Sequence, residues 1–363
     1  MQIVIRTDAS YSIGTGHVIR CLTLADALTR KGANVSFICR EHDGHLCNLI
    51  EERGYTVHRL QKPEDTVHEN SELAHAAWLG ASWKQDVDQT SECIKGLKSK
   101  PDWLVVDHYG IDSQWEQCLR PQVSRILVID DLADRDHDCD VLLDQNLVAD
   151  MSTRYFTRVP KNCTCLLGPD YALLQPIYAD LHDRIPPREG PVRRILISFG
   201  GTDSDNLTGR ALEAFISLNR PDIEVDVVIT IGNQYTASLQ KLAAIYPNIH
   251  LHSNLPTLAP LIAAADLAIG AAGTTSWERL CLGLPALVVT LAENQHSVAI
   301  NLHRNGLIKL IGHKDQVNML LLSQTLNQNL YATSLFDWSS RCMKVCDGKG
   351  LSRVQDLLIT LSL

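Results

Sequence analysis

Short apolar runs alternate with segments of helical periodicity along most of the chain, and this alternation restricts the possible folds more than any other feature of the sequence. In the N-terminal half, apolar runs predict strands at residues 3–5, 35–39, 55–58, 103–106 and 126–129. Apolar residues at helical spacing predict helices at 18–30 and 43–53 and helical segments up to residue 98, and the polar segment 61–70 predicts a loop. This order of elements favours mostly parallel sheets with helices on both faces.

The alternation restarts after a segment that is rich in proline and glycine. Residues 175–191 contain four prolines and Gly190, which is typical of a linker. Beyond this segment a helix is predicted at 206–218, and strands are predicted at residues 195–199, 225–231, 250–252, 267–269 and 286–289.

A chain of 363 residues is longer than a single domain with one compact core usually is. We therefore predict an α/β protein with two doubly wound, parallel-sheet, Rossmann-like domains, at residues 1–185 and 186–345. The last 50 or so residues are expected to be helical, and the final segment, 346–363, is expected to pack back on the first domain. Ligands of open α/β sheets bind at the carboxyl ends of the strands. The active site is therefore expected in a cleft that the two domains face.

The charge balance excludes one large class of function. Lys and Arg number 33 against 42 Asp and Glu, so the net charge is −9, and aromatic residues make up only 6% of the chain. A nucleic-acid-binding protein would normally show a basic footprint or stacking aromatic residues. Hydrophobic residues at 45% and charged residues at 21% are typical of a globular protein. We expect an enzyme that acts on a small molecule, without a nucleic-acid partner.

The cysteines indicate a reducing compartment. Eleven are scattered along the chain, several of them in apolar runs, and the odd count does not suggest a disulfide framework. Cys163 and Cys165 form one C-x-C without a second pair, which is a weak signal for zinc. Residues 1–6 are too short an apolar run for a signal peptide, and no apolar run approaches the roughly 20 residues that span a bilayer. We expect a cytoplasmic protein with no membrane partner.

A glycine-rich segment follows the first predicted strand. Residues 6–20 read RTDASYSIGTGHVIR, with His17 directly after Gly16 and before a predicted helix. Glycine allows backbone N–H groups to approach an anion, and a helix N-terminus favours negative charge. His17 would then lie within reach of a bound phosphate or anomeric carbon. For the G-x-G-H pattern alone, however, a plain glycine turn with a capping histidine is the favoured explanation. The dinucleotide fingerprint G-x-G-x-x-G is absent because its third glycine position holds Ile19, so NAD is disfavoured.

Polar residues also follow the later strands of the N-terminal half. Residues 107–110 read DHYG, and from the residues alone Asp107 either faces the cleft or builds a turn. Carboxylates recur at residues 130–135, DDLADR, and at 144–146, DQN. Such clusters could bind Mg²⁺, but a charged loop with an Asp–Arg pair is the simpler explanation, and we predict no metal and no cofactor.

The C-terminal half carries a second loop of small and hydroxyl residues. Residues 273–276 read GTTS at the start of a predicted helix, and Glu278 lies about one turn in. Gly273 to Ser276 could offer N–H and hydroxyl donors to a diphosphate, and the Glu278 carboxylate could accept both ribose hydroxyls. The alternative is structural, because Thr275 and Glu278 also have the spacing of a capping box.

In combination these motifs resemble the UDP-2,4-diacetamido-2,4,6-trideoxy-β-L-altropyranose hydrolases of the pseudaminic acid pathway, which are relatives of the N-acetylglucosaminyltransferase that forms lipid II. The resemblance runs from Arg6 to about Gly306. It rests on the segment after residue 6 and on residues 107–110, 130–135, 167–174, 199–203, 273–278 and 293–295. The chain departs from the family pattern after Pro176, where it reads IYAD, in the predicted linker.

The resemblance implies a GT-B-like fold, with UDP held mainly by the C-terminal domain and with specific roles for individual residues. His17 is the implied general base, and Tyr109, also implied as catalytic, lines the sugar site. The loop from Gly273 through Thr274 and Thr275 to Ser276 would hold the diphosphate, and Glu278 the ribose. Further substrate contacts implied for this chain are Asp8, Gly14, Gly16, Arg20, Asn146, Gly201, Asn294 and Gln295, the last two reaching the sugar or its phosphate.

The implied reaction is hydrolysis of a UDP-linked diacetamido sugar by water, with C–O cleavage and inversion. Histidine suits the base role near neutral pH because its ordinary pKa is about 6.5. Three alternatives remain open: a glycosyltransferase of the same fold, a hydrolysing UDP-sugar 2-epimerase, and a non-catalytic nucleotide-sugar binder. The net charge of −9 weighs against docking on an anionic membrane and requires that a UDP-sugar be recognised through local donors.

Overall fold

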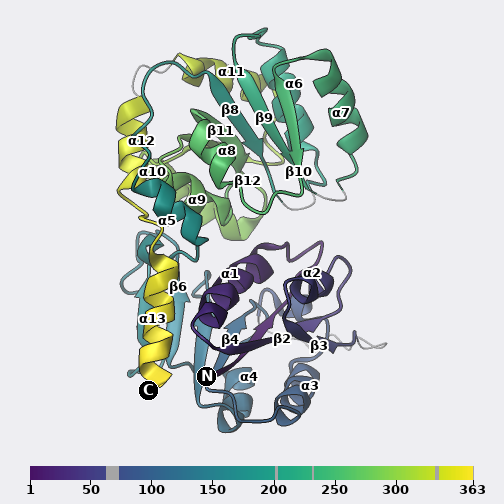
Figure 1. Cartoon of the computed structure of the whole chain (residues 1–363), viewed down its shortest axis with the longest axis vertical. Coiled ribbons are helices and arrows are strands. Elements are labelled where there is room, and N and C mark those ends of the chain that lie inside the picture. The colour runs from purple at the N-terminus through teal and green to yellow at the C-terminus, as the bar shows by residue number, and fades with distance from the viewer. Residues whose placement is uncertain (63–72, 201–202, 231–232, 332–334, 363) are drawn as a thin grey trace. The chain divides into compact units, whose positions relative to one another are not determined.

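The computed structural model describes residues 1–62, 73–200, 203–230, 233–331 and 335–362, and its described strands form two parallel sheets (Figure 1). The chain divides into two compact units. The first unit comprises residues 1–146, residues 150–173 and the segment from Gly350 onward, and the second comprises residues 147–149 and 174–349. The predicted α/β class with two doubly wound parallel sheets is confirmed.

The first unit contains a seven-stranded sheet in the order β3-β2-β1-β4-β5-β6-β7. Its strands are β1 (Gln2–Thr7), β2 (Asn34–Arg40), β3 (Thr56–Leu60), β4 (Trp103–Asp107), β5 (Arg125–Ile129), β6 (Val141–Asp144) and β7 (Thr164–Leu167). Its helices are α1 (Gly16–Arg30), α2 (Cys47–Glu52), α3 (Trp83–Lys95), α4 (Ser113–Leu119) and α13 (Gly350–Ser362), with short 3-10 turns η1 (Ala76–Leu79), η2 (Arg120–Gln122) and η3 (Pro169–Tyr171).

Apolar residues on both faces of this sheet are buried, as expected for parallel strands covered by helices. Successive side chains of a strand point to opposite faces. Ile3 and Ile5 of β1 therefore join the core beneath α1 and α13, whereas Val4 joins a second core with Trp115 of α4. All three β1 residues are fully buried, so the sheet is the centre of the unit.

The second unit contains a six-stranded sheet in the order β10-β9-β8-β11-β12-β13. Its strands are β8 (Arg194–Ser198), β9 (Glu224–Ile229), β10 (Ile249–Ser253), β11 (Leu267–Ala271), β12 (Ala286–Thr290) and β13 (Lys309–His313). Its helices are α5 (Pro176–His182), α6 (Leu207–Ile216), α7 (Thr236–Ile245), α8 (Ala259–Ala264), α9 (Thr275–Cys281), α10 (His296–Arg304), α11 (Met319–Leu330) and α12 (Leu335–Met343), with the 3-10 turn η4 (Glu293–Gln295).

The two sheets share one strand order, and this order locates their ligand-binding edges. In each sheet the chain winds outward over three strands and then returns to the other side of the first one. Ligands of such sheets bind at this switch point, beyond the carboxyl ends of the two central strands. The switch point lies between β1 and β4 in the first unit and between β8 and β11 in the second.

Several segments differ from the sequence prediction. The expected linker at 175–191 begins with helix α5, because Pro176 occupies the first helical turn, where its missing N–H group costs nothing. The helix expected at 43–53 is limited to Cys47–Glu52. The short strands β6, β7 and β13 were not anticipated, and most of the loop predicted at 61–70 lies outside the described residues.

The unit boundary falls before α5, whereas the predicted domain boundary was 185/186. The reason is packing, because α5 lies against α8 and α9 of the second unit. The chain re-enters the first unit at Gly350 with α13, which packs against α1. There the indole Nε1 of Trp103 donates to the Leu358 carbonyl at 3.3 Å and to the Ser362 hydroxyl at 2.8 Å.

A buried histidine makes the stability of the first unit dependent on pH. His137 Nδ1 lies 2.8 Å from Glu116 Oε1, and His137 Nε2 lies 3.8 Å from Asp130 Oδ2. Burial alone would lower the pKa of His137, but the two carboxylates outweigh it and raise the pKa to about 9. The folded state therefore holds a proton on His137 more tightly than the unfolded chain does, where the pKa is about 6.5.

We predict that this ion pair contributes about 3 kcal/mol to the free energy of unfolding below pH 6.5, and that the contribution is lost as the pH rises to about 9. Urea unfolding of the wild type and of His137→Gln, measured from pH 6 to pH 9.5, would test it. The stability difference between the two proteins should shrink by that amount over the range. A difference that stays constant with pH would show that His137 is neutral when buried.

Candidate active site

The glycine-rich loop of the first unit connects β1 to α1. Gly14 has φ of 82°, a left-handed conformation that favours glycine, and its amide donates to the Ser10 carbonyl at 2.9 Å. The helix begins at Gly16, so His17 lies within its first turn. From the sequence, the helix was expected to start just after His17. The histidine is therefore held on a rigid element, with 8% of its surface exposed.

His17 forms a close pair with Asp107, the last residue of β4. Because β4 is paired in register with β1, Asp107 lies opposite Thr7 at the switch point, and its Oδ1 is 2.5 Å from His17 Nδ1. Burial alone would raise the pKa of Asp107, but Arg20 and His17 hold it well below its usual range. The ionised carboxylate must accept from Nδ1–H. This fixes the tautomer and leaves Nε2 of His17 as the proton acceptor.

Arg20 lies between two carboxylates. Its Nε and Nη2 donate to Asp107 at 2.6 and 2.7 Å, and its Nη1 donates to Asp131 Oδ2 at 2.6 Å. The side chain is buried, and the resemblance had implied that it contacts substrate. In the structure it orients Asp107, which in turn orients His17.

Asp131 brings together two further residues that the sequence singled out. Its Oδ2 accepts from the Tyr109 hydroxyl at 2.6 Å, and its Oδ1 accepts from Asn146 Nδ2 at 2.9 Å. Burial and the Asp131 carboxylate raise the pKa of Tyr109 well above its usual range, so the hydroxyl keeps its proton. The Tyr109 ring stands edge-on to the His17 ring, with centroids 4.6 Å apart. His17, Arg20, Tyr109 and Asn146 thus form one connected cluster.

Two aromatic residues of this cluster were missed by the sequence analysis. Trp78, in η1, stacks on Tyr109 with ring centroids 5.6 Å apart and an interplanar angle of 25°. His75, next to η1, lies 4.5 Å from Trp78 by ring centroids. They follow a polar segment without periodicity, so only the tryptophan itself, rare in this chain, could have drawn attention to the segment.

Asp8 is placed differently from the other predicted residues. It is fully buried, and its Oδ1 accepts from Arg6 Nη1 and from the Arg40 amide, each at 2.6 Å. Its Oδ2 lies 3.4 Å from the Nε2 atoms of His42 and His108. Burial alone would raise the pKa of Asp8, but Arg6 and the two histidines hold it well below its usual range. Its neighbours are therefore protein groups, and it joins β1 to β2.

The small-residue loop of the second unit follows β11 and leads into α9. Gly273 is exposed, and a Cβ atom there would meet no other atom within 4 Å. The N-cap residue of α9 is Thr274, which makes no side-chain capping hydrogen bond. The alternative that Thr275 and Glu278 form a capping box is therefore wrong. The Glu278 carboxylate is not used to cap the helix.

Several polar atoms of the second unit are buried without partners among the residues that the structure describes. They include Oε2 of Glu278, in the first turns of α9, and Oδ1 of Asn294, in η4. Burial raises the pKa of Glu278, although the Tyr178 hydroxyl and the Arg279 guanidinium act in the opposite direction. Buried polar atoms normally have hydrogen-bond partners, so unpaired ones in an open loop region indicate a place for a ligand. Gln295 differs, because its Oε1 already accepts from the Leu291 amide at 2.9 Å.

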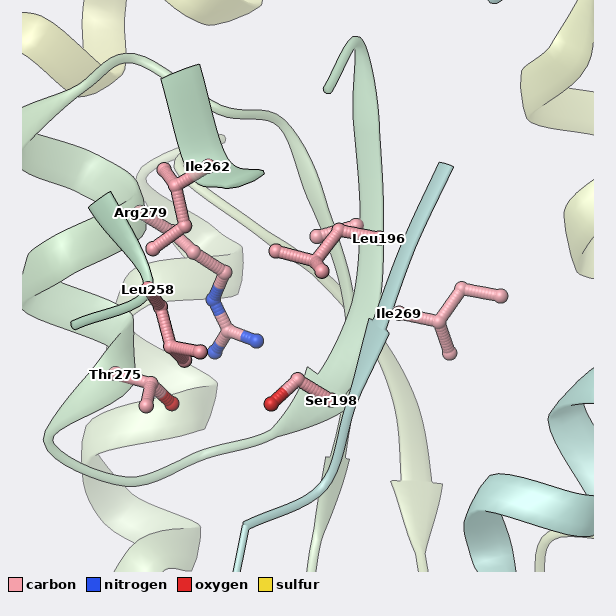
Figure 2. A pocket seen from close by; sticks show the side chains of 8 residues that line it. Leu196, Ser198, Leu258, Ile262, Ile269, Thr275 and Arg279 are labelled. Carbon is pink, nitrogen blue, oxygen red and sulfur yellow. The ribbon is translucent and has the colours of Figure 1, made fainter. Parts of the chain in front are cut away.

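A small pocket lies at the switch point of the second sheet (Figure 2). Figure 2 shows the Arg279 guanidinium turned into it, near the hydroxyls of Ser198 and Thr275, among the side chains of Leu196, Leu258 and Ile262. Gly201, implied as a substrate contact, lies outside the described residues. Asp203 of the same segment caps α6, accepting from the amides of Leu207 and Thr208 at 2.8 and 3.0 Å.

The described part of the chain offers neither a membrane span nor a metal cluster. Within it, no helix is both long enough and apolar enough to cross a membrane. No group of three or more histidine, cysteine or acidic side chains there is arranged to hold a metal ion. The carboxylates at 130 and 131 instead bind protein donors, among them Arg135 and Arg20.

Comparison with known proteins gives matches over both units. Residues 195–335, from β8 into α12, match the glycosyltransferase family 28 C-terminal domain. A UDP-2,4-diacetamido-2,4,6-trideoxy-β-L-altropyranose hydrolase of Campylobacter jejuni is 28% identical over 307 residues, 84% of this chain and 97% of that protein. The spore coat polysaccharide biosynthesis protein SpsG of Bacillus subtilis is 23% identical. The alignment covers 99% of this chain and 98% of SpsG.

An uncharacterized protein of Methanocaldococcus jannaschii is 26% identical over 81% of this chain, and the chain spans little more than half of its length, 56%. Among solved structures, MurG of Acinetobacter baumannii superimposes with a TM-score of 0.65 at 18% identity, covering 99% of both chains. The likeness to MurG confirms the GT-B fold. The predicted resemblance is thus also confirmed: the chain is similar over most of its length to a UDP-diacetamido-trideoxy-altropyranose hydrolase, and its residues 195–335 match the glycosyltransferase family 28 C-terminal domain.

Proposed function

We propose that the chain hydrolyses a UDP-linked 2,4-diacetamido-2,4,6-trideoxy sugar to UDP and the free sugar, in the biosynthesis of a nonulosonate such as pseudaminic acid. The observation that carries the proposal is the pair of His17 and Asp107 at the switch point of the first sheet. An ionised, buried carboxylate on Nδ1 makes Nε2 a base for a water molecule. The similarity to the Campylobacter hydrolase supports the choice of substrate.

The first unit would supply the base. His17 Nε2 takes a proton from water, and the water oxygen forms a bond to the anomeric carbon. The bond between this carbon and the phosphate oxygen breaks, and its electron pair leaves with UDP. Asp107 stabilises the imidazolium that forms, and Arg20 holds Asp107 in place through two hydrogen bonds. Because water enters opposite the leaving group, the anomeric configuration inverts.

The second unit would hold UDP. The loop from Gly273 to Ser276 offers backbone and hydroxyl donors to the diphosphate, and unpaired Glu278 Oε2 can accept a ribose hydroxyl. Unpaired Asn294 Oδ1 can accept a hydrogen bond from the sugar. UDP leaves as an anion, so donors that are positioned before the reaction stabilise it without a dedicated general acid.

A glycosyltransferase is the second candidate. The match to the glycosyltransferase family 28 C-terminal domain and the likeness to MurG favour it, because the same second unit could present a UDP-sugar to an alcohol instead of water. The two functions differ in one requirement. A transferase needs an acceptor for turnover, and a hydrolase does not.

We expect the purified chain to release UDP from the diacetamido UDP-sugar with no acceptor present. Turnover in H₂¹⁸O should place ¹⁸O in the sugar and none in UDP, and NMR should show the inverted anomer first. UDP-N-acetylglucosamine serves as the control substrate. It has a hydroxyl group at C4 instead of the acetamido group, and a hydroxyl group at C6, where the proposed substrate has none. Release that begins only after an alcohol is added would establish a transferase. Label in UDP would exclude C–O cleavage, and a product altered at C2 would indicate an epimerase.

A further inference from the structure

Arg279 is a buried cation without a carboxylate partner among the described residues. Only 3% of the residue is exposed, and no described acidic side chain lies within ion-pair distance of it. Its Nη2 donates to the Ala271 carbonyl at 2.7 Å and to the Ser276 hydroxyl at 3.1 Å, and its Nε has no partner in the described chain. Burial lowers the pKa of Arg279 to about 10, so the side chain is still charged at neutral pH.

The other buried arginines show how unusual this is. Those in the first unit, Arg6, Arg20, Arg40 and Arg135, each bind at least one carboxylate. Arg188, in the second unit, binds the carbonyls of Ile262 and Ala265 at the end of α8, where the helix dipole is negative. Within the described residues Arg279 forms no ion pair, and its guanidinium binds Ala271 and Ser276 instead of carbonyls at a helix end. The neighbouring Glu278 carboxylate raises the pKa of Arg279, but only from beyond ion-pair distance. A buried cation without a close counter-charge is costly, and an anion in contact with the guanidinium would supply one.

The guanidinium contacts both ends of the loop that leads into α9. Ala271 ends β11 and Ser276 lies in the first turn of the helix, so one nitrogen joins the residues on either side of Gly273. Because Ser276 Oγ accepts from Arg279, its own proton is free to be donated elsewhere. The backbone leaves room for the cation only because residue 270 is glycine. A Cβ there would lie 2.7 Å from Arg279 Nη1 and 2.1 Å from the Ser198 carbonyl.

We infer that Arg279 is a positioning residue for a diphosphate. It fixes the loop from Ala271 to Ser276, leaves the proton of the Ser276 hydroxyl free for a phosphate oxygen and places a positive charge beneath the phosphates. The ligand class is a nucleoside diphosphate, and this inference rests on the proposed function, in which the same loop binds UDP. It adds a full positive charge to the backbone and hydroxyl donors of the loop, which favours recognition of a dianion in a chain of net charge −9.

The test compares UDP with uridine, which has no phosphate, on the full chain. Arg279→Met should weaken UDP binding about 10- to 100-fold, the range expected for a lost charged hydrogen bond, and change uridine binding less than about twofold. Arg188→Met is the matched control, because it removes another buried arginine of the same unit. Its ratio of UDP to uridine affinity should equal that of the wild type. Calorimetry for UDP and NMR titration for uridine give the two constants.

Two further variants cover the case in which Arg279→Met does not fold. Ser276→Ala should weaken UDP binding selectively over uridine. Arg279→Lys keeps the charge but loses the guanidinium whose Nη2 donates to both Ala271 and Ser276. It should therefore retain only part of the preference for UDP over uridine. Equal losses for UDP and uridine in the Arg279 variants would overturn the inference and leave the proposed function intact. A wild-type chain that binds no UDP would overturn both.

Discussion

Replacing His17 by alanine is expected to lower kcat for UDP release by about 10²- to 10⁴-fold, the usual contribution of a general base. The reason is geometric. Asp107 occupies Nδ1 at 2.5 Å, so Nε2 is the atom that can accept a proton from water, and alanine supplies no substitute. Steady-state release of UDP from the diacetamido UDP-sugar measures the effect. His17→Gln, which keeps most of the volume of the side chain, should lose activity to a similar extent.

Binding of UDP provides the control for this prediction. His17 belongs to the first unit, whereas the proposed UDP-binding loop belongs to the second. The His17 variants should therefore bind UDP with the affinity of the wild type. Near-normal turnover in His17→Ala would remove the histidine from the mechanism. A parallel loss of UDP binding and of thermal stability would instead indicate damage to the fold.

Replacing Asp86 by alanine is expected to destabilise the protein by about 3–5 kcal/mol, because it leaves buried cations without their counter-charge. Asp86 lies in α3 and is fully buried. Its Oδ2 accepts from Arg6 Nη2 and from Arg40 Nη2, each at 2.7 Å, and its Oδ1 accepts from the Trp115 indole at 3.0 Å. Burial alone would raise the pKa of Asp86, but the two arginines lower it, so the carboxylate is ionised.

Urea unfolding followed by circular dichroism measures this loss. Asp88→Ala is the matched control, because Asp88 lies two residues further along the same helix and is exposed. Its effect should stay within about 0.5 kcal/mol, as is usual at the surface. If Asp86→Ala cost no more than the Asp88 variant, water or the remaining side chains would have to satisfy Arg6 and Arg40. The position of α3 would then not depend on this carboxylate.

The sequence predicted the glycine loop, His17 and the small-residue loop because each is a local pattern. Gly14, Gly16 and His17 are consecutive or nearly so, and Gly273 to Glu278 form one short segment. The role of Asp107 could not be decided in the same way, since a strand-end carboxylate also suits a turn. The structure shows its role, because β4 lies beside β1 and so brings His17 and Asp107, 90 positions apart in the sequence, into contact.

Long-range charge pairing was the least predictable part of the site. Arg20, Asp131 and Asn146 are ordinary surface types in a sequence, yet the structure buries or half-buries them in one network. Asp86 belongs to no motif at all, although it accepts hydrogen bonds from residues of three other elements, β1, β2 and α4. Burial forces such groups to find partners, and which partners are near is a property of the sheet order, not of spacing in the chain.

By itself, then, the sequence determined the α/β class, the two parallel sheets and the residues of the local loops. The reason is that the spacing of apolar residues and the positions of glycines are local signals, visible within a few residues. Only the tertiary structure decided that α5 packs with the second unit, that Asp107 orients His17, and that Arg279 is buried beside Ser276 with no described carboxylate at ion-pair distance. These outcomes depend on which strands become neighbours. Strand order follows from packing both faces of each sheet, and no short segment of sequence contains that information.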